Sequence, residues 1–226
     1  MNRFAVIALP PLVLGFAAAG LSYLAAGHSL GFYFGGAAMI ALLVPPLCVM
    51  HDRPLDALIA AGSAIDGIAI AWLVAALATP VTLGQWFAAY LVIFAFGAAL
   101  FSSALLLRRA IGPTLAAALT TIVALLWLAW PICLSPRISG GAVAWLAPAH
   151  PLLALNHVFN EMGVWTEQRL MYQFTALGQD VPYKLPASVG PCVLVHAAIA
   201  LVLGWFVWSS RPAESAAPRS EVSPAS

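Results

Sequence analysis

The stretch "WFAAYLVIFAFGAALFSSALLL" occupies residues 86–107, and the basic pair Arg108 and Arg109 follows it directly. It contains no charged residue, and it has the roughly 20 apolar residues that a helix needs to cross the hydrocarbon core of a bilayer. Apolar and polar residues do not alternate in it, and backbone groups within lipid must find their partners inside the segment. The stretch therefore predicts a membrane-spanning helix that ends at two arginines.

The composition of the whole chain agrees with a membrane protein. Of the 226 residues, 63% are hydrophobic and 8% are charged, whereas a soluble domain is roughly 45–50% apolar and ~25% charged. A water-soluble fold of this size could not bury so much apolar surface, so the solvent must be lipid. The net charge of +1 gives no basic field that would attract nucleic acid.

Five further apolar runs have the length of a span, so we expect six transmembrane helices. Basic residues concentrate on the cytoplasmic side of membrane proteins. With the N-terminus inside, six arginines, among them Arg3, Arg108 and Arg109, lie on that side, against three basic residues outside. The sequence thus predicts an all-α polytopic membrane protein over residues 1–210, with both termini in the cytoplasm and a disordered tail over 211–226. The five further runs are residues 4–26, 30–50, 64–83, 111–132 and 189–209.

Residues 51–66, "HDRPLDALIAAGSAID", gather charge between two of these runs. Pro54 suits the first position of a helix, and Gly62 is typical of a helix end. This predicts a short helix over residues 54–61 on the cytoplasmic surface, between the second and third spans, and the alternative is a simple interfacial turn. The charged residues at its start are Asp52, Arg53 and Asp56.

Asp66 stands where the third span is predicted to begin. Ser63 and Asp66 have the S-x-x-D spacing of a capping box, and an acid in the first turn suits the helix dipole. An ionisable residue within a span is otherwise a sign of function. Two interpretations stay open: Asp66 caps the third span, or it faces a substrate path. His196, in the sixth span, is expected to form a hydrogen bond to a neighbouring helix, and the alternative is that it titrates in a mechanism.

Residues 133–188 form the one long connection, which the predicted orientation places outside. A loop of this length usually has a structure or function of its own. The spacing of apolar residues predicts two short amphipathic helices that lie on or dip into the outer leaflet, over residues 151–163 and 166–178. A membrane enzyme with its site in this loop is an alternative to transport, and it would use the His and Glu side chains. The polar candidates in the loop are His150, Asn156, His157, Glu161 and Glu167.

The sequence lacks several motifs that would indicate other chemistry. No C-x-x-C or H-E-x-x-H pattern is present, and His150 and His157 have no evident third metal ligand. No G-x-x-x-x-G-K-[ST] phosphate loop is present either, so the chain would not bind ATP in that way. We expect no catalytic residue, no metal site and no cofactor in this chain.

Three stretches resemble a known family. These are "DRPLDALIAAGSAIDG" at 52–67, "LFSSALLLRRAIGPTLAAALTTIVALLWLAWP" at 100–131, and "WLAPAHPLLALNHVF" at 145–159. Together with six spans, a charged segment after the second span and a helical external loop, they resemble the ABC-2 type transporter permease. The resemblance covers most of the chain.

The resemblance implies a permease subunit that pairs with a second copy, as a homo- or heterodimer, and with separate ATP-binding cassette subunits. ATP and Mg would be held by those subunits, and a hydrophobic or lipid-like substrate would leave outward across a bacterial cytoplasmic (inner) membrane. Asp52, Arg53 and Asp56 would contact the ATPase. Arg108 and Arg109 would line the same surface, or they only set the topology. An accessory membrane protein without transport activity is the remaining alternative.

Overall fold

Six long apolar helices make up most of the fold. The computed structural model describes residues 3–26, 32–133, 140–159 and 186–209, and within these ranges all regular structure is helical. Six of the helices are long and apolar enough to cross a membrane, which confirms the predicted all-α protein with six spans. They are α1 (Arg3–Ala25), α2 (Phe32–Met50), α3 (Pro54–Ala76), α4 (Leu83–Ile111), α5 (Pro113–Cys133) and α9 (Gly190–Ser209).

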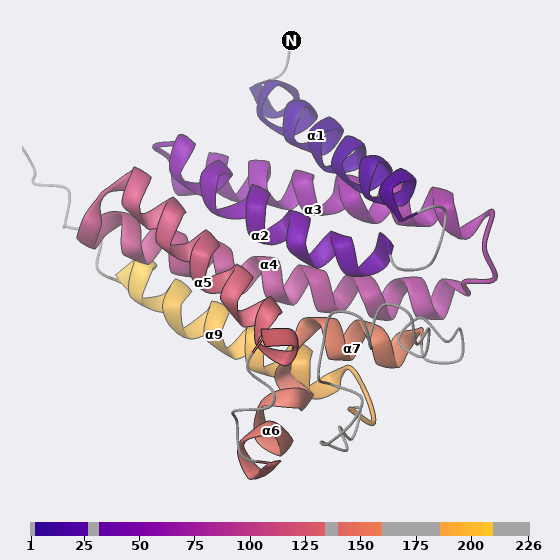
Figure 1. Cartoon of the computed structure of the whole chain (residues 1–226). Helices are drawn as coiled ribbons and strands as arrows, with labels where there is room; N and C mark the ends of the chain where they lie inside the picture. The colour runs from indigo at the N-terminus through magenta and orange to yellow at the C-terminus, as the bar shows by residue number, and fades with distance from the viewer. Residues whose placement is uncertain (1–2, 27–31, 134–139, 160–185, 210–226) are drawn as a thin grey trace, which may run out of the picture.

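Helix α4 is the centre of the bundle. It packs against α2, α3, α5 and α9, whereas α1 packs mainly against α3. Figure 1 shows α1 along one edge of the bundle and α9 along another, beside α4. The central helices are accordingly the most buried, while α1 and α9 leave most of their side chains exposed to the surrounding lipid.

Small residues allow α1 and α3 to pack closely. A Cβ atom on Gly15 would lie 2.1 Å from the carbonyl oxygen of Ala64, and one on Gly67 would lie 2.1 Å from that of Leu12. No side chain larger than hydrogen fits at either position without a backbone shift. Such contacts between small residues are a common basis of helix association in membranes, because they bring two backbones together.

The structure does not contain the separate surface helix that the sequence predicted over residues 54–61, because α3 includes these residues. Helix α3 is continuous from Pro54 to Ala76, with Arg53 at the N-cap and Pro54 in the first turn. Residues 54–61 are therefore the first turns of the third span, and Gly62 does not end a helix. Buried residues recur every three or four positions along α3, at 57, 61, 64, 68 and 71, so one apolar face packs against the bundle without interruption.

Within the described part of the connection between α5 and α9, α7 and a 3₁₀ turn pack against the spanning helices. This connection contains α6 (Gly140–Leu146), the 3₁₀ turn (Ala147–Ala149) and α7 (Pro151–Val158). The start of α7 at Pro151 agrees with the sequence prediction, and the position of this helix relative to the outer leaflet stays a prediction. Helix α7 packs against α2 and α4, and the side-chain amide of Gln85 donates a hydrogen bond to the carbonyl of Val158 (3.2 Å). The second predicted loop helix, residues 166–178, lies outside the described residues.

Aromatic residues fill the space between α7 and the spans. Tyr33 of α2 is fully buried and lies between Trp72 and Phe159, with ring centroids 5.0 Å and 4.3 Å away. Its hydroxyl is 3.5 Å from the carbonyl of Trp72. Phe159 directly follows α7 and is also fully buried, so this end of α7 is anchored against α2.

Candidate functional site

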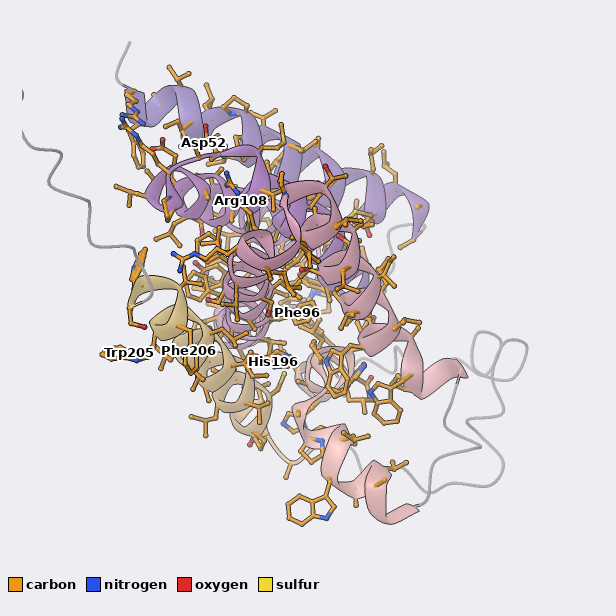
Figure 2. All side chains as sticks on the ribbon, turned by 90° about the vertical axis from the view of Figure 1, so that its left-hand side faces the viewer. Asp52, Phe96, Arg108, His196, Trp205 and Phe206 are labelled. Carbon is orange, nitrogen blue, oxygen red and sulfur yellow. The ribbon has the colours of Figure 1, made fainter. Side chains whose placement is uncertain are left out.

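Ion pairs join three parts of the chain at the end of the bundle where α3 begins. Arg108, in the last turn of α4, donates to Asp52 (Nη2 to Oδ1, 3.0 Å) and to the backbone carbonyl of His51. Arg3, at the start of α1, pairs with Asp56 (Nη2 to Oδ2, 2.6 Å). We call Arg3, Asp52, Asp56 and Arg108 the charged cluster. Figure 2 shows Asp52 and Arg108 together at this end.

Helix termini explain where these charges lie. Asp56 is in the first turn of α3 and Arg108 in the last turn of α4, so each charge has the sign that its helix dipole favours. The pairs are open to solvent on one side, because the Arg3 side chain is 59% exposed and the Asp52 side chain is fully exposed. Pairs of this kind typically contribute about 0–1 kcal/mol each, so they contribute little to the stability of the fold.

The structure gathers the predicted coupling residues at one end of the bundle. Arg108 and Arg109 line a hollow of about 250 Å³ together with Asp52, and Asp56 joins the cluster through Arg3. Arg53 is exposed at the N-cap of α3, and its side chain makes no capping hydrogen bond. Contact of these residues with an ATPase stays a prediction.

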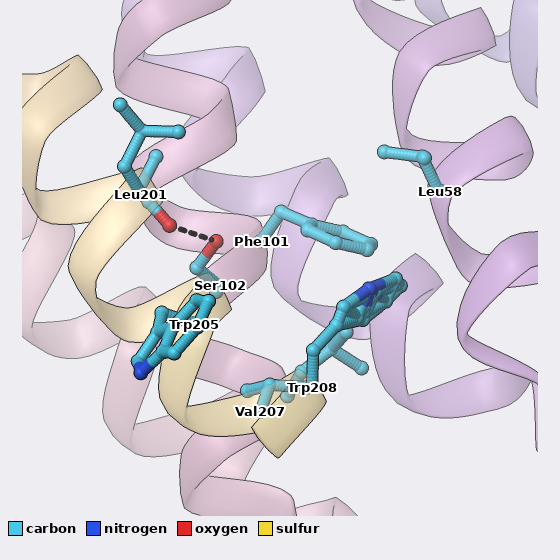
Figure 3. Close-up of a pocket in the computed structure, with 10 residues that line it drawn as sticks. Leu58, Phe101, Ser102, Leu201, Trp205, Val207 and Trp208 are labelled. Atoms are coloured by element: carbon cyan, nitrogen blue, oxygen red, sulfur yellow. Dashed lines mark hydrogen bonds between the residues drawn. The ribbon is translucent and has the colours of Figure 1, made fainter.

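An apolar hollow of about 420 Å³ lies beside this cluster, between α4, α9 and the start of α3. Figure 3 shows Phe101 and Leu58 on one side of it and two tryptophans of α9 on the other. The hydroxyl of Ser102 donates to the carbonyl of Ala200 (3.1 Å) and so links α4 to α9 at its base. Trp205 is 72% exposed, so the hollow is open toward lipid.

The hollow belongs to a longer groove along α4. A second hollow of about 210 Å³ shares Leu58, Phe101 and Ser102 with it and continues to Phe94. On the other side, the hollow next to Arg108 shares Leu105 and Val207 with it. We call the three together the α4 groove. The sequence did not reveal it, because most of its wall residues are ordinary apolar residues from three separate helices.

Asp66 does not cap a helix. It lies near the middle of the 23-residue α3, and its carboxylate is exposed on the outside of the helix, where it accepts a hydrogen bond from the hydroxyl of Tyr90 (3.0 Å). The capping box with Ser63 is therefore wrong, because the helix has already begun at Pro54. A charged side chain at the bilayer centre costs about 2.5–3.5 kcal/mol on insertion scales, so Asp66 requires an explanation.

A row of aromatic side chains lies beside Asp66, and the sequence interpretation did not predict it. Trp86, Tyr90 and Phe94 recur every four residues on α4, and consecutive ring centroids are 5.7 Å apart. The indole of Trp86 donates to the carbonyl of Ala69 (2.9 Å), which holds the row against α3. Aromatic residues four positions apart lie on one face of a helix, so the sequence could have indicated this row. Only the fold shows that Asp66 lies beside it.

His150 has a structural position. It is fully buried at the N-cap of α7, where Nδ1 accepts from the Leu153 amide (3.4 Å) and Nε2 lies 2.8 Å from the carbonyl of Trp127. A neutral ring that is protonated at Nε2 satisfies both contacts. Burial lowers the pKa of His150 from its ordinary 6.5 to about 4. Both nitrogens are thus engaged, and the ring is not open to a substrate.

The other polar candidates of the loop do not assemble into a site within the described residues. Asn156 was expected on an exposed face, but it is buried in α7, because the neighbouring spans cover that face as well. His157 is partly buried, and Glu161 and Glu167 lie outside the described residues. No group of three His, Cys, Asp or Glu that could hold a metal is present in the described part of the chain.

His196 packs between α9 and α4. Its Nδ1 lies 2.8 Å from the carbonyl of Cys192, one turn earlier in the same helix, and its ring meets Phe96 edge-on at 5.4 Å. The predicted hydrogen bond to another helix is thus replaced by a bond within α9.

Residues 27–31 have the sequence G-H-S-L-G, which has the G-x-S-x-G spacing of a nucleophile elbow. That motif follows a strand, whereas these residues follow a helix and lie outside the described part.

Comparisons with protein-family models, with curated proteins and with solved structures found no match for this chain.

Proposed function

We propose that this integral membrane protein is the membrane-spanning subunit of an ABC-2 type transporter, which exports a hydrophobic or lipid-like substrate across a bacterial cytoplasmic membrane. The charged cluster is the observation that carries the proposal. Its two ion pairs lie at one end of the bundle: one joins the start of α1 to the first turn of α3, and the other joins the end of α4 to the link between α2 and α3. A partner that moved this end would act on four of the six spans.

The packing of the spans supports such coupling. Helix α1 packs closely against α3 at Gly15 and Gly67, and α4 packs against α2, α3, α5 and α9. A displacement of the charged cluster would therefore reach most of the bundle. ATP on a partner subunit could bias the protein between two arrangements only if the partner binds one of them better.

The α4 groove supports an apolar substrate. It begins at the charged cluster and continues along α4, and its largest hollow is lined almost entirely by apolar side chains. In this proposal ATP and Mg bind to the partner ATPase, and a second copy of the chain completes the transporter. The loop enzyme is the weaker alternative, because His150 has both ring nitrogens engaged in the fold.

Affinity purification of the tagged protein from its native membrane tests the proposal. A P-loop ATPase should copurify in near-stoichiometric amount and be lost from the Arg53→Glu variant. Arg53 suits this test, because it is exposed and makes no capping hydrogen bond, so its reversal leaves the described ion pairs in place. Arg169→Glu, predicted to lie on the opposite side of the membrane, is the matched charge reversal and should retain the ATPase.

The opposite result would reject the transporter. If no ATPase copurifies while other membrane complexes stay intact, the protein acts without one. If both charge reversals lose the ATPase equally, residues 51–56 are not its contact.

A further inference from the structure

Asp66 carries a charge at a depth where the fold gives it little compensation. It lies near the middle of α3 and points outward, and the Tyr90 hydroxyl is its hydrogen-bond donor. Both ion pairs found among the described residues are at the end of the bundle where α3 begins. Ionisable residues within spans usually pair with another group or mark the path of a substrate.

The surroundings of Asp66 are aromatic. Tyr90 is stacked on Trp86 with an angle of 7° between the rings and contacts Phe94 on its other side. Trp86 and Tyr90 are half-buried and Phe94 is exposed, so the row is accessible from the membrane. Aromatic faces attract cations, most strongly where water is excluded.

The α4 groove offers space next to this row. Its 210 Å³ hollow is lined by Phe94 and by Gly62, and Gly62 lies one helical turn from Asp66 on α3. The hollow then opens toward the 420 Å³ hollow at Phe101. A ligand with its charge at Asp66 would therefore have an apolar groove for its hydrophobic body.

We propose that Asp66, Trp86, Tyr90 and Phe94 bind a hydrophobic organic cation, such as a substituted ammonium or phosphonium. This inference rests on the proposed function, since it names the substrate class of that transporter. The carboxylate balances the positive charge, the aromatic row covers the cation, and the α4 groove takes the apolar groups.

Other occupants fit the same residues less well. An anion would be repelled by Asp66. A bare metal ion needs several oxygen or nitrogen ligands, and no group of three acidic, His or Cys side chains is present among the described residues. A symmetric contact with a second copy at this face would bring two Asp66 carboxylates together, which is unfavourable for like charges.

Binding of tetraphenylphosphonium to the purified full-length protein tests the proposal. Equilibrium dialysis in detergent, with detergent alone as the blank, should give saturable binding. Tetraphenylborate has the same shape and the opposite charge, and it should not bind saturably. Asp66→Asn should weaken the binding of tetraphenylphosphonium by about tenfold to a hundredfold, because it removes an ionised partner from an apolar site.

Two pairs of variants separate charge and aromaticity from a general effect on the fold. Asp66→Glu retains the charge and should bind far better than Asp66→Asn. Phe94→Leu removes one aromatic face of the row and should weaken binding by about two- to fivefold. Phe87→Leu changes an exposed aromatic of α4 outside the row and should bind like the original protein. Size-exclusion profiles and melting temperatures show whether each variant is folded.

Three results would overturn the proposal. The first is that the original protein does not bind tetraphenylphosphonium saturably. The second is that tetraphenylborate binds equally well. The third is that folded Asp66→Asn binds tetraphenylphosphonium with unchanged affinity. If Asp66→Asn instead converts a dimer to monomers at unchanged affinity, the carboxylate belongs to an interface between copies. The assay contains no ATPase, so cation binding without a copurifying ATPase would retain this site and reject the transporter.

Discussion

His150 connects α7 to the end of α5 through both nitrogens of its ring. Trp127 and Trp130 enclose the imidazole, with ring centroids 5.3 Å and 5.5 Å away, and Nε2 lies 2.8 Å from the carbonyl of Trp127. His150 is fully buried, so a charged ring would lose its contact with solvent. The neutral form is therefore the one that the fold stabilises.

We predict that His150 makes stability fall in weak acid. Its pKa is about 4 in the fold against an ordinary 6.5, so below pH 6.5 the unfolded chain binds the proton more readily. Its contribution is complete above that pH and is lost as the pH falls toward 4, amounting to about 2 kcal/mol by pH 5. Melting curves in detergent from pH 7 to pH 5 measure this loss.

His150→Asn is the matched variant, because Asn also caps a helix but does not titrate. Its melting temperature should depend less on pH than that of the original protein, because the two proteins differ only at residue 150. If the melting temperatures of the two proteins depend on pH in the same way, His150 is accessible to protons in the folded protein.

At the scale of elements, α3 carries two groups of charged residues that the sequence assigned to separate segments. Its first turns carry Arg53 and Asp56 at the charged cluster, and its middle carries Asp66. A rigid helix connects these positions, because no break intervenes at Gly62. Movement at the cluster would therefore reach the depth of Asp66 directly.

Glycine substitutions test the continuity of α3. A methyl group added at Gly62 would meet no neighbouring atom within 4 Å, whereas one added at Gly67 would lie 2.1 Å from the Leu12 carbonyl oxygen. In a continuous helix Gly62→Ala should leave stability unchanged or raise it by up to about 1 kcal/mol, because alanine loses less backbone entropy. Gly67→Ala should lower it by about 1–3 kcal/mol through overpacking.

Thermal unfolding of both variants in the same detergent gives the comparison. A marked loss of stability in Gly62→Ala would indicate a helix end with a left-handed glycine, as the sequence pattern predicts. Equal effects of the two variants would contradict the close contact between α1 and α3.

For the whole molecule, orientation decides which face meets a cytoplasmic partner. The positive-inside rule places Arg53, Arg108 and Arg109 in the cytoplasm, and the structure puts these residues at one end of the bundle. The fold is compatible with either orientation, so the side of the membrane on which the charged cluster lies stays a prediction from charge.

Reporter fusions at the C-terminus test this orientation. A fused green fluorescent protein should be fluorescent, because this reporter is active on the cytoplasmic side. A fused alkaline phosphatase should be inactive, because it is active only on the outer side. Active phosphatase would place the charged cluster outside and would exclude its contact with a cytoplasmic ATPase. A phosphatase fused within residues 133–188 is the control and should be active.

The sequence by itself determined the number of spanning helices and the start of α7 at Pro151, because apolar length and proline position act within a single segment. It also indicated the charged cluster, since charges between two apolar runs must lie at a membrane surface. Only the tertiary structure decided that α3 runs unbroken through Gly62, that His150 is buried, and that Asp66 lies beside Tyr90. Those features depend on which faces neighbouring helices cover, and packing between segments distant in the chain leaves no local pattern.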